Sequence, residues 1–150
     1  MKASLNKMDV TKLWRFLKFC LVGGSGVVVD MTALYFLASP KHSGMPYQWA
    51  KVYAAETALL NNFLWNELWT FRDAALSRPA FHSVLRRIFK FHAICGVGIL
   101  WAVGLLWLLH GGVKLNLYSA NLLSIGLVTI WNYWLNARFN WRIESKGQFD

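Results

Sequence analysis

Paired asparagines mark two apolar stretches of this 150-residue chain. Asn62 and Asn66 lie four residues apart, and Asn132 and Asn136 repeat the pair nearer the C-terminus. Residues four apart share one face of a helix, so each pair predicts a polar strip on an apolar helix. A buried amide needs a hydrogen-bond partner. The strips therefore predict either hydrogen bonds between packed helices or a path that replaces water around a polar ligand.

Two carboxylates, Asp30 and Glu56, lie deep inside the apolar stretches. Counting about 1.5 Å per residue from the charged helix ends places Asp30 about 22 Å and Glu56 about 20 Å inside. We therefore expect both at one level on neighbouring helices. Ionisable groups at this depth are costly and are candidates for function. The two acids could share a proton; alternatively, Glu56 could pair with Lys51.

Cations gather where the apolar stretches end. The guanidinium fork of arginine suits a phosphate group, and lysine adds a point charge. Cations at such positions also commonly fix the orientation of membrane helices. Trp65 and Trp69 lie at the same level, either as interface anchors or as planes on which a sugar ring stacks. The candidate phosphate ligands are Arg15, Lys18, Arg72, Arg87, Lys90, Arg138 and Arg142.

The other reactive residue types show no catalytic pattern, so we expect no enzyme. The four histidines lack a metal-ligand spacing, and no metal or other cofactor is expected. Cys20 and Cys95 lie within apolar stretches, where we expect them to pack without forming a disulfide. The glycine run 23–26 also lies inside an apolar stretch, where small residues let helices approach closely. It therefore predicts helix packing and not a nucleotide-binding loop.

The elements that carry these residues are long and apolar. The chain is 56% hydrophobic and holds nine tryptophans, which is too apolar for an ordinary soluble domain of this length. None of the stretches has a polar face wide enough for water, and the first is too long for a cleavable signal peptide. We expect an all-α membrane protein with four transmembrane helices of about 20 residues each. These spans are 16–38, 47–69, 88–110 and 117–138.

The distribution of charge predicts the orientation of the spans. Of the 16 lysine and arginine residues, all but Lys41, Lys51 and Lys114 fall near the termini or between the second and third spans. The positive-inside rule then places both termini and the middle loop in the cytoplasm. The net charge of +9 indicates attraction to anionic lipids. Because these cations flank membrane spans, nucleic acid is not an expected partner.

The chain repeats itself. A shift of 72 positions brings Arg15 and Lys18 onto Arg87 and Lys90. A shift of 70 positions brings the first asparagine pair onto the second and Arg72 onto Arg142. Because each copy holds two spans, both copies must cross the membrane in the same direction. This predicts two parallel two-helix repeats.

The expected organisation follows from these copies. The first repeat covers residues 16–72 and the second covers 88–142. Residues 1–15 form a basic segment along the membrane surface, and 73–87 form an amphipathic cytoplasmic linker that runs as an interfacial helix into the third span. Residues 143–150 form a cytoplasmic tail. Because four helices are too few to enclose a sugar-sized cavity, we also expect a homo-oligomer, most simply a dimer.

The motifs as a set resemble those of the GtrA-like family over residues 15–142. The first copy carries Arg15-Phe16-x-x-Phe19-x-x-x-Gly23 and Asn62-Phe63-x-x-Asn66-x-x-Trp69-Thr70-Phe71-Arg72. The second carries Arg87–Gly96 and Asn132-Tyr133-Trp134-Leu135-Asn136-Ala137-Arg138-Phe139-Asn140-Trp141-Arg142. The chain departs from its own repeat where Asn140 replaces Thr70 and where no acid matches Glu56.

The resemblance implies a small four-span protein of the bacterial inner membrane that serves cell-surface polysaccharide synthesis. Members of the family are thought to flip polyprenyl-phosphate-linked monosaccharides, typically undecaprenyl-phosphate glucose. The sugar then modifies O-antigen, teichoic acid or other cell-wall glycans. We expect such a flippase, with cations at the loading face and with asparagines and carboxylates along the path. Two alternatives are a scaffold that docks a membrane glycosyltransferase and a small proton-coupled solute or drug transporter.

Overall fold

The computed structural model describes residues 7–142, and every regular element in that range is helical. The chain forms two compact units, Met1–Ala75 and Leu76–Asp150. Each unit contains one antiparallel hairpin of two long helices. This agrees with the all-helical fold that the sequence predicts.

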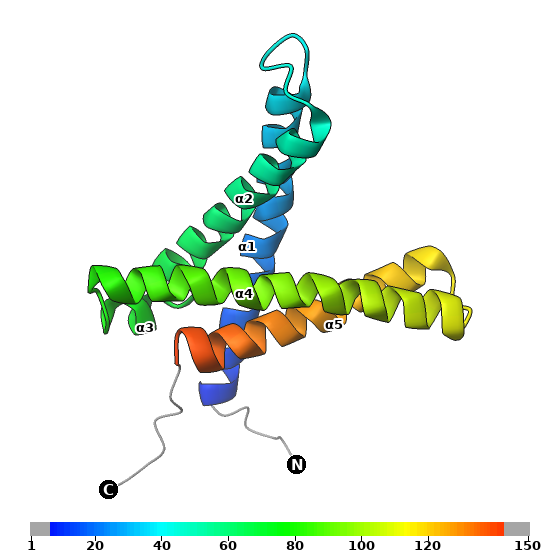
Figure 1. Ribbon diagram of the computed structural model, residues 1–150. Helices are drawn as coiled ribbons and strands as arrows, with labels where there is room; N and C mark the ends of the chain where they lie inside the picture. The colour runs from blue at the N-terminus through cyan, green and yellow to red at the C-terminus, as the bar shows by residue number, and fades with distance from the viewer. Residues whose placement is uncertain (1–6, 143–150) are drawn as a thin grey trace, which may run out of the picture. The chain divides into compact units, whose positions relative to one another are not determined.

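The first unit pairs α1 (Lys7–Ala38) with α2 (Tyr47–Trp65), as Figure 1 shows. The π-helical turn η1 (Asn66–Thr70) and the short helix α3 (Arg72–Leu76) follow α2 directly. α1 ends where Ser39 and Pro40 begin the connecting loop, because proline has no backbone N–H to continue a helix. The helix is continuous from residue 7, so the basic segment and the first predicted span form one helix. Residues 1–6 of the predicted basic segment lie outside the described residues, and its position along the membrane surface stays a prediction.

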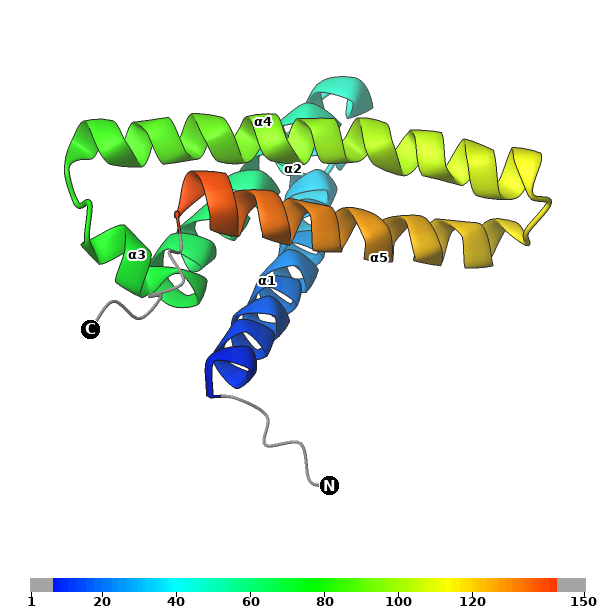
Figure 2. The same cartoon turned by 90° about the horizontal axis from the view of Figure 1, so that it is seen from below.

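The second unit repeats this arrangement. Figures 1 and 2 show α4 (Phe81–Leu106) side by side with α5 (Leu117–Leu135). α4 continues into the π-helical turn η2 (Trp107–Gly112), and α5 continues into η3 (Asn136–Asn140). The helix that begins at Phe81 runs into the third predicted span without a break, whereas residues 77–80 of the predicted linker are not helical. The position of the linker at the membrane surface stays a prediction.

Corresponding turns in the two units use the same backbone geometry. The N–H of Phe71 donates to the carbonyl of Asn66 at 2.8 Å, and the N–H of Trp141 donates to that of Asn136 at 2.9 Å. In both bonds the donor lies five positions after the acceptor, which is the wide turn of a π-helix. In the connecting loops, Gly44 and Lys114 occupy equivalent positions with φ values of 62° and 65°. A lysine in this left-handed conformation costs about 1–2 kcal/mol more than glycine.

Small residues bring the two helices of each hairpin together. Ala50 and Ala120 are completely buried, and Ser124 is 1% exposed. A Cβ atom on Gly26 would lie 2.8 Å from Cγ of Asn62, and one on Gly98 would lie 2.6 Å from Oδ1 of Asn132. Gly26 therefore has the packing role that the sequence predicts for the run 23–26, and Gly98 has the same role in the second unit, because only a hydrogen atom leaves room for the opposing amide. A Cβ atom on Gly23 or Gly24 would meet nothing within 4 Å among the described residues, so these two glycines do not pack in this way.

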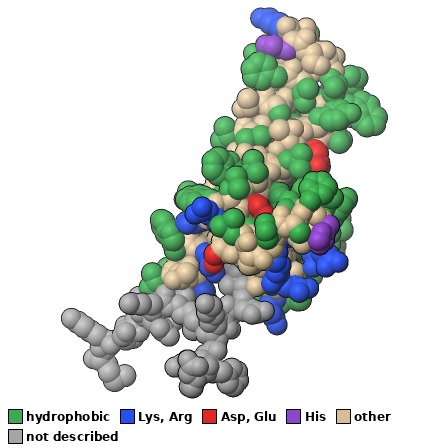
Figure 3. Space-filling view, turned by 90° about the vertical axis from the view of Figure 1, so that its left-hand side faces the viewer, with side chains coloured by type: hydrophobic (Ala, Val, Ile, Leu, Met, Phe, Trp, Pro, Cys, Tyr) green, Lys and Arg blue, Asp and Glu red, His purple; other side chains and the backbone are tan. Residues whose placement is uncertain are grey.

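The outward faces of the helices are apolar. Val27, Leu100 and Leu122 are 63%, 72% and 71% exposed. Figure 3 shows many hydrophobic side chains along the α1–α2 hairpin, in the upper part of the view. Within the described residues, Val10–Ala38 and Phe81–Gly112 are long and apolar enough to cross a membrane, with mean hydropathies of 1.6 and 2.0.

The other two predicted spans, 47–69 and 117–138, fall on α2 with η1 and on α5 with η3. Their passage through the membrane stays a prediction, as does the parallel arrangement of the two repeats.

Candidate functional site

The asparagine strips lie at the same place in both units. Asn66 donates through Nδ2 to the carbonyl of Asn62 at 2.8 Å, and Asn136 donates to the carbonyl of Asn132 at 2.9 Å. Asn66 is 2% exposed and Asn136 is fully buried. The side chain of the second asparagine in each pair, Asn66 or Asn136, therefore donates to the backbone of its own helix. The first asparagine of each pair lies against a glycine of the neighbouring helix: Asn62 against Gly26, and Asn132 against Gly98.

Several oxygen atoms along these strips are buried without a hydrogen-bond partner among the described residues. They belong to the side chains of Asn66, Thr70, Asn132 and Asn140. A buried acceptor without a donor costs about 1–3 kcal/mol. Such atoms suit a water molecule or a ligand hydroxyl that donates to them.

The intramembrane acid of α1 forms an ion pair. Lys51 donates through Nζ to both carboxylate oxygens of Asp30, at 2.8 and 2.6 Å. The Asp30 side chain is 17% exposed and that of Lys51 is 56% exposed. The sequence offers Glu56 as a partner for Lys51, whereas the structure pairs Lys51 with Asp30. Glu56 lies further along α2 with an exposed side chain.

The predicted phosphate ligands of the first unit already contact other groups. Arg15 forms an ion pair with the carboxylate of Asp73. The Nζ atom of Lys18 lies 5.1 Å from the ring centroid of Trp69 and 5.9 Å from that of Trp14. These distances allow cation–π attraction. Arg15 and Lys18 are therefore held by groups of their own unit.

The remaining predicted residues of the first unit lie at the surface. Arg72 begins α3 and is exposed. Trp65 and Trp69 are 48% and 41% exposed, which suits either of their two predicted roles. Trp69 also contacts Lys18, a contact that the sequence does not predict.

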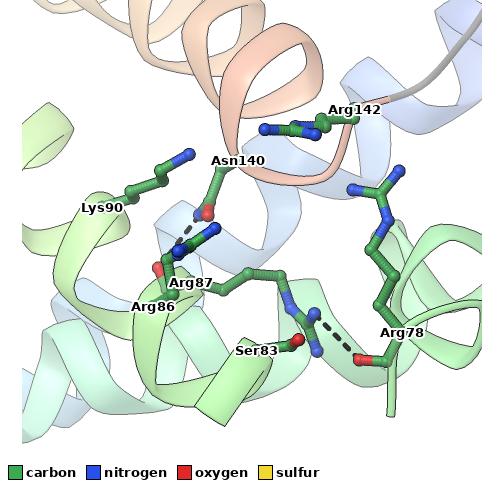
Figure 4. A pocket seen from close by; sticks show the side chains of 7 residues that line it. All are labelled: Arg78, Ser83, Arg86, Arg87, Lys90, Asn140 and Arg142. Atoms are coloured by element: carbon green, nitrogen blue, oxygen red, sulfur yellow. Dashed lines mark hydrogen bonds between the residues drawn. The ribbon is translucent and has the colours of Figure 1, made fainter. Parts of the chain in front are cut away.

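The equivalent cations of the second unit line a pocket of about 80 Å³. This volume is several times the space that one water molecule needs. No carboxylate is among the described residues that line it, and five of those residues are cationic. The lining residues, drawn in Figure 4, are Arg78, Ser83, Arg86, Arg87, Lys90, Asn140 and Arg142.

The pocket is built around α4. Ser83, Arg86, Arg87 and Lys90 follow one another at spacings of three, one and three residues, which places them along one side of that helix. Arg87 is only 5% exposed, and its Nη1 donates to the carbonyl of Arg78 at 3.1 Å. Figure 4 shows this guanidinium pointing toward the turn that precedes α4. A buried arginine thus fixes the turn that carries Arg78.

η3 closes the pocket from the other helix. Nδ2 of Asn140 donates to the carbonyl of Arg87 and to Oδ1 of Asn136, both at 3.1 Å. Lys90 donates through Nζ to the carbonyl of Phe139 at 3.2 Å. These bonds hold the end of η3 on α4, as Figure 4 shows for Asn140. They also connect the pocket to the second asparagine strip.

The pocket differs in part from the predicted phosphate ligands. It contains Arg87, Lys90 and Arg142, whereas Arg138 is exposed on η3 and does not line it. Sequence reasoning did not assign Ser83, Arg78, Arg86 or Asn140 to phosphate binding. The spacing of Ser83, Arg86 and Lys90 along one helix face is a signal that could have found part of the set.

Comparison with known proteins identifies the family. The family described as "GtrA/DPMS, transmembrane domain" matches residues 18–141. The chain belongs to this family. The match confirms the resemblance that the motifs carry, and with the two apolar helices it makes the chain a membrane protein.

A curated relative of this GtrA/DPMS chain is dolichol-phosphate mannosyltransferase of Pyrococcus furiosus. It is 33% identical over 129 residues, which are 85% of this chain and 34% of the relative. The chain therefore spans about a third of that protein's length. The family match runs from Lys18 to Trp141, so it includes both asparagine strips and most of the basic pocket.

Proposed function

We propose that this chain is a translocase that carries the headgroup of a polyprenyl-phosphate-linked monosaccharide from the cytoplasmic to the outer leaflet. Undecaprenyl-phosphate glucose or a similar lipid of the bacterial inner membrane is the expected cargo. The family match and the name of the relative support a cargo of this chemistry. We propose no covalent step, so the chain acts as a carrier and not as an enzyme.

One observation carries this proposal: hydrogen-bonded amides lead from the basic pocket into an apolar hairpin. Asn140 lines the pocket and donates to Asn136, which donates to the carbonyl of Asn132. Oδ1 of Asn140 and Oδ1 of Asn132 are buried acceptors without a partner among the described residues. This series of hydrogen-bonded asparagines therefore has an unpartnered amide oxygen at each end, and a ligand hydroxyl could donate to either oxygen.

The chemistry of the cargo matches this series. A phosphosugar headgroup is anionic and rich in hydroxyls, and carrying it unsolvated through hydrocarbon would cost many kcal/mol. Cations at the cytoplasmic mouth would replace the solvation of the phosphate, and amide oxygens would replace that of the hydroxyls. The prenyl chain stays in lipid beside the apolar outer faces. A homodimer would provide the larger enclosure that one pair of hairpins lacks.

Reconstituted liposomes provide the test. The purified chain is inserted into vesicles with a polyprenyl-phosphate glucose, and periodate, which does not cross membranes, oxidises only the sugars exposed outside. We expect the inner-leaflet fraction to become oxidised over time in vesicles with the protein and to stay protected in vesicles without it. Equal protection in both would contradict translocation.

A matched pair of α5 variants links transport to the strip. Asn132→Ala removes an unpartnered amide, and we expect transport to slow by about tenfold or more. Thr129 donates to its own helix at the Ile125 carbonyl at 2.8 Å. We expect Thr129→Ala to keep the wild-type rate.

A second candidate function is a membrane scaffold for a glycosyltransferase. The relative that this chain resembles over a third of its length carries the name of a mannosyltransferase, which favours such an association. Lipid transport by the purified chain alone would favour the translocase. Co-purification of a glycosyltransferase, together with no transport, would favour the scaffold. Loss of function in Arg78→Gln or Arg86→Gln would not distinguish the scaffold from the translocase, because both residues line the pocket that the translocase would use.

A further inference from the structure

The two copies of the repeat have diverged at the positions that decide whether their cations are neutralised. Arg15 and Lys18 correspond to Arg87 and Lys90. In the first unit, Asp73 neutralises Arg15, and the rings of Trp14 and Trp69 cover Lys18.

The second copy keeps an aromatic residue, Phe139, at the position of Trp69 but differs at the other two positions. By the repeat, Trp14 corresponds to Arg86 and Asp73 corresponds to Ile143. A cation thus replaces an aromatic ring, and an apolar residue replaces the acid. Thr70 corresponds to Asn140, which supplies two further hydrogen bonds within the pocket. The changes at the positions of Trp14 and Asp73 favour an anion in the second unit alone, whereas Asn140 uses both of its donors within the unit.

We propose that each chain holds one phosphodiester site, in the second unit, and that Asn140 there recognises a hydroxyl of the group joined to the phosphate. Arg78, Arg86, Lys90 and Arg142 bind the phosphate oxygens, and Arg87 positions the turn that carries Arg78. The equivalent cations of the first unit, Lys18 and Arg72, lie outside the site. This inference rests on the proposed function for the identity of the lipid.

The charge of the pocket favours an anion. Five cationic side chains line about 80 Å³, and like charges at such separations repel one another unless a counter-charge lies between them. A phosphate group suits a pocket of this size and charge. Phosphate oxygens accept bidentate bonds from arginine.

Asn140 determines which kind of phosphate ester fits. Its Nδ2 already donates two hydrogen bonds, and its buried Oδ1 has no partner among the residues that the structure describes. An acceptor beside a phosphate repels the phosphate oxygens and attracts a hydroxyl hydrogen. The site therefore suits a phosphodiester whose second substituent carries hydroxyls. A glycosyl phosphate and the glycerol headgroup of phosphatidylglycerol share this chemistry.

Binding measurements on the purified chain test the phosphate part. The probes are a ten-carbon polyprenyl phosphate with and without glucose, and a short-chain phosphatidylglycerol, each titrated by calorimetry in mild detergent. The double variant Lys90→Gln/Arg142→Gln should weaken both polyprenyl probes by about tenfold or more, the loss of one or two charge-assisted bonds. The repeat-equivalent control Lys18→Gln/Arg72→Gln has the same net charge and should weaken them less than about twofold. Equal losses in both would overturn the single site.

The hydroxyl part is tested by a ratio. Asn140→Thr gives the second unit the residue of the first, and we expect the preference for the glucosylated probe over the bare phosphate to fall toward one. Thr70→Val is the control and should leave that ratio at the wild-type value. An unchanged ratio in Asn140→Thr would overturn the role of Asn140. Phosphatidylglycerol that binds as tightly as the glucosylated probe would identify the site as one for ordinary anionic lipid.

Failure of this inference and failure of the proposed function give different results. If Lys90→Gln/Arg142→Gln binds and transports lipid like the wild type, the site is wrong and the translocase stands. If the wild-type chain binds the glucosylated probe in the expected way but transports none, the site stands and the translocase is wrong.

Discussion

The close approach of glycine and asparagine in each hairpin predicts a large difference between two neighbouring alanine variants. In Gly98→Ala the new Cβ would lie 2.6 Å from Oδ1 and 3.1 Å from Cγ of Asn132, so the amide must move. Overpacking of this kind costs about 1–3 kcal/mol. In Gly96→Ala the new methyl group meets nothing within 4 Å. Both variants gain the same helix propensity of about 1 kcal/mol over glycine. Their difference therefore isolates the overpacking term.

Thermal unfolding of the purified variants in one detergent measures this difference. We expect Gly98→Ala to melt below Gly96→Ala by roughly 2–12 °C, the shift that about 1–3 kcal/mol produces in a chain of this size. The double variant Gly98→Ala/Asn132→Ala removes the obstructing amide and should recover most of the loss. The first unit offers the same comparison between Gly26→Ala and Gly24→Ala, since Gly24 also has nothing within 4 Å. If Gly98→Ala and Gly96→Ala melt at one temperature, the hairpin contact described above does not exist.

Three further predictions concern the charged groups. Lys51→Met should lower the melting temperature, because it leaves Asp30 without its ion-pair partner. The swap Asp30→Lys/Lys51→Asp should restore the melting temperature. A swap variant that melts no higher than Lys51→Met would contradict the ion pair. Asp73→Asn should change the free energy of unfolding by no more than about 1 kcal/mol, because the Asp73 side chain is 65% exposed. The same variant should bind the bare polyprenyl phosphate more tightly, because it frees Arg15 from its ion pair. Unchanged binding in the same titration would show that Asp73 does not mask Arg15. Arg87→Lys should destabilise the chain by about 1–3 kcal/mol, because it loses the hydrogen bond to the Arg78 carbonyl. The control Arg86→Lys should leave the melting temperature unchanged. Equal melting temperatures of these two variants would contradict the structural role of Arg87.

Much of the hairpin architecture could be predicted from local signals. Proline and glycine in the loops mark where α1 ends and α2 begins, and the spacing of Asn62 and Asn66 places both on one helix face. The repeat then transfers these expectations to the second unit. Even the contact of Gly26 with Asn62 follows the general rule that small residues admit close helix packing. The helix ends and the asparagine spacing depend on neighbours a few residues away.

The composition of the pocket could not be predicted in the same way. Asn140 reaches the backbone of Arg87 because η3 makes a π-helical turn, which rotates the residues after Asn136 away from the positions that a period of 3.6 would give. Arg78 enters the pocket through a turn that the buried Arg87 fixes. The choice of Asp30 as the partner of Lys51 likewise depends on the register between two helices, which sequence spacing leaves open.

The divergence of the two copies separates two kinds of polar group. The cationic pocket belongs to the second copy, whereas Asp30 and Glu56 belong to the first, with Ala102 and Gly126 at the corresponding positions of the second. One copy thus carries the groups that suit a phosphate, and the other carries the acids that suit hydroxyls. A symmetric pair of hairpins would offer the same affinity for the headgroup at two equivalent places. Because the two copies differ, the phosphate has one favoured place, in the second unit, instead of two equivalent places of the same affinity.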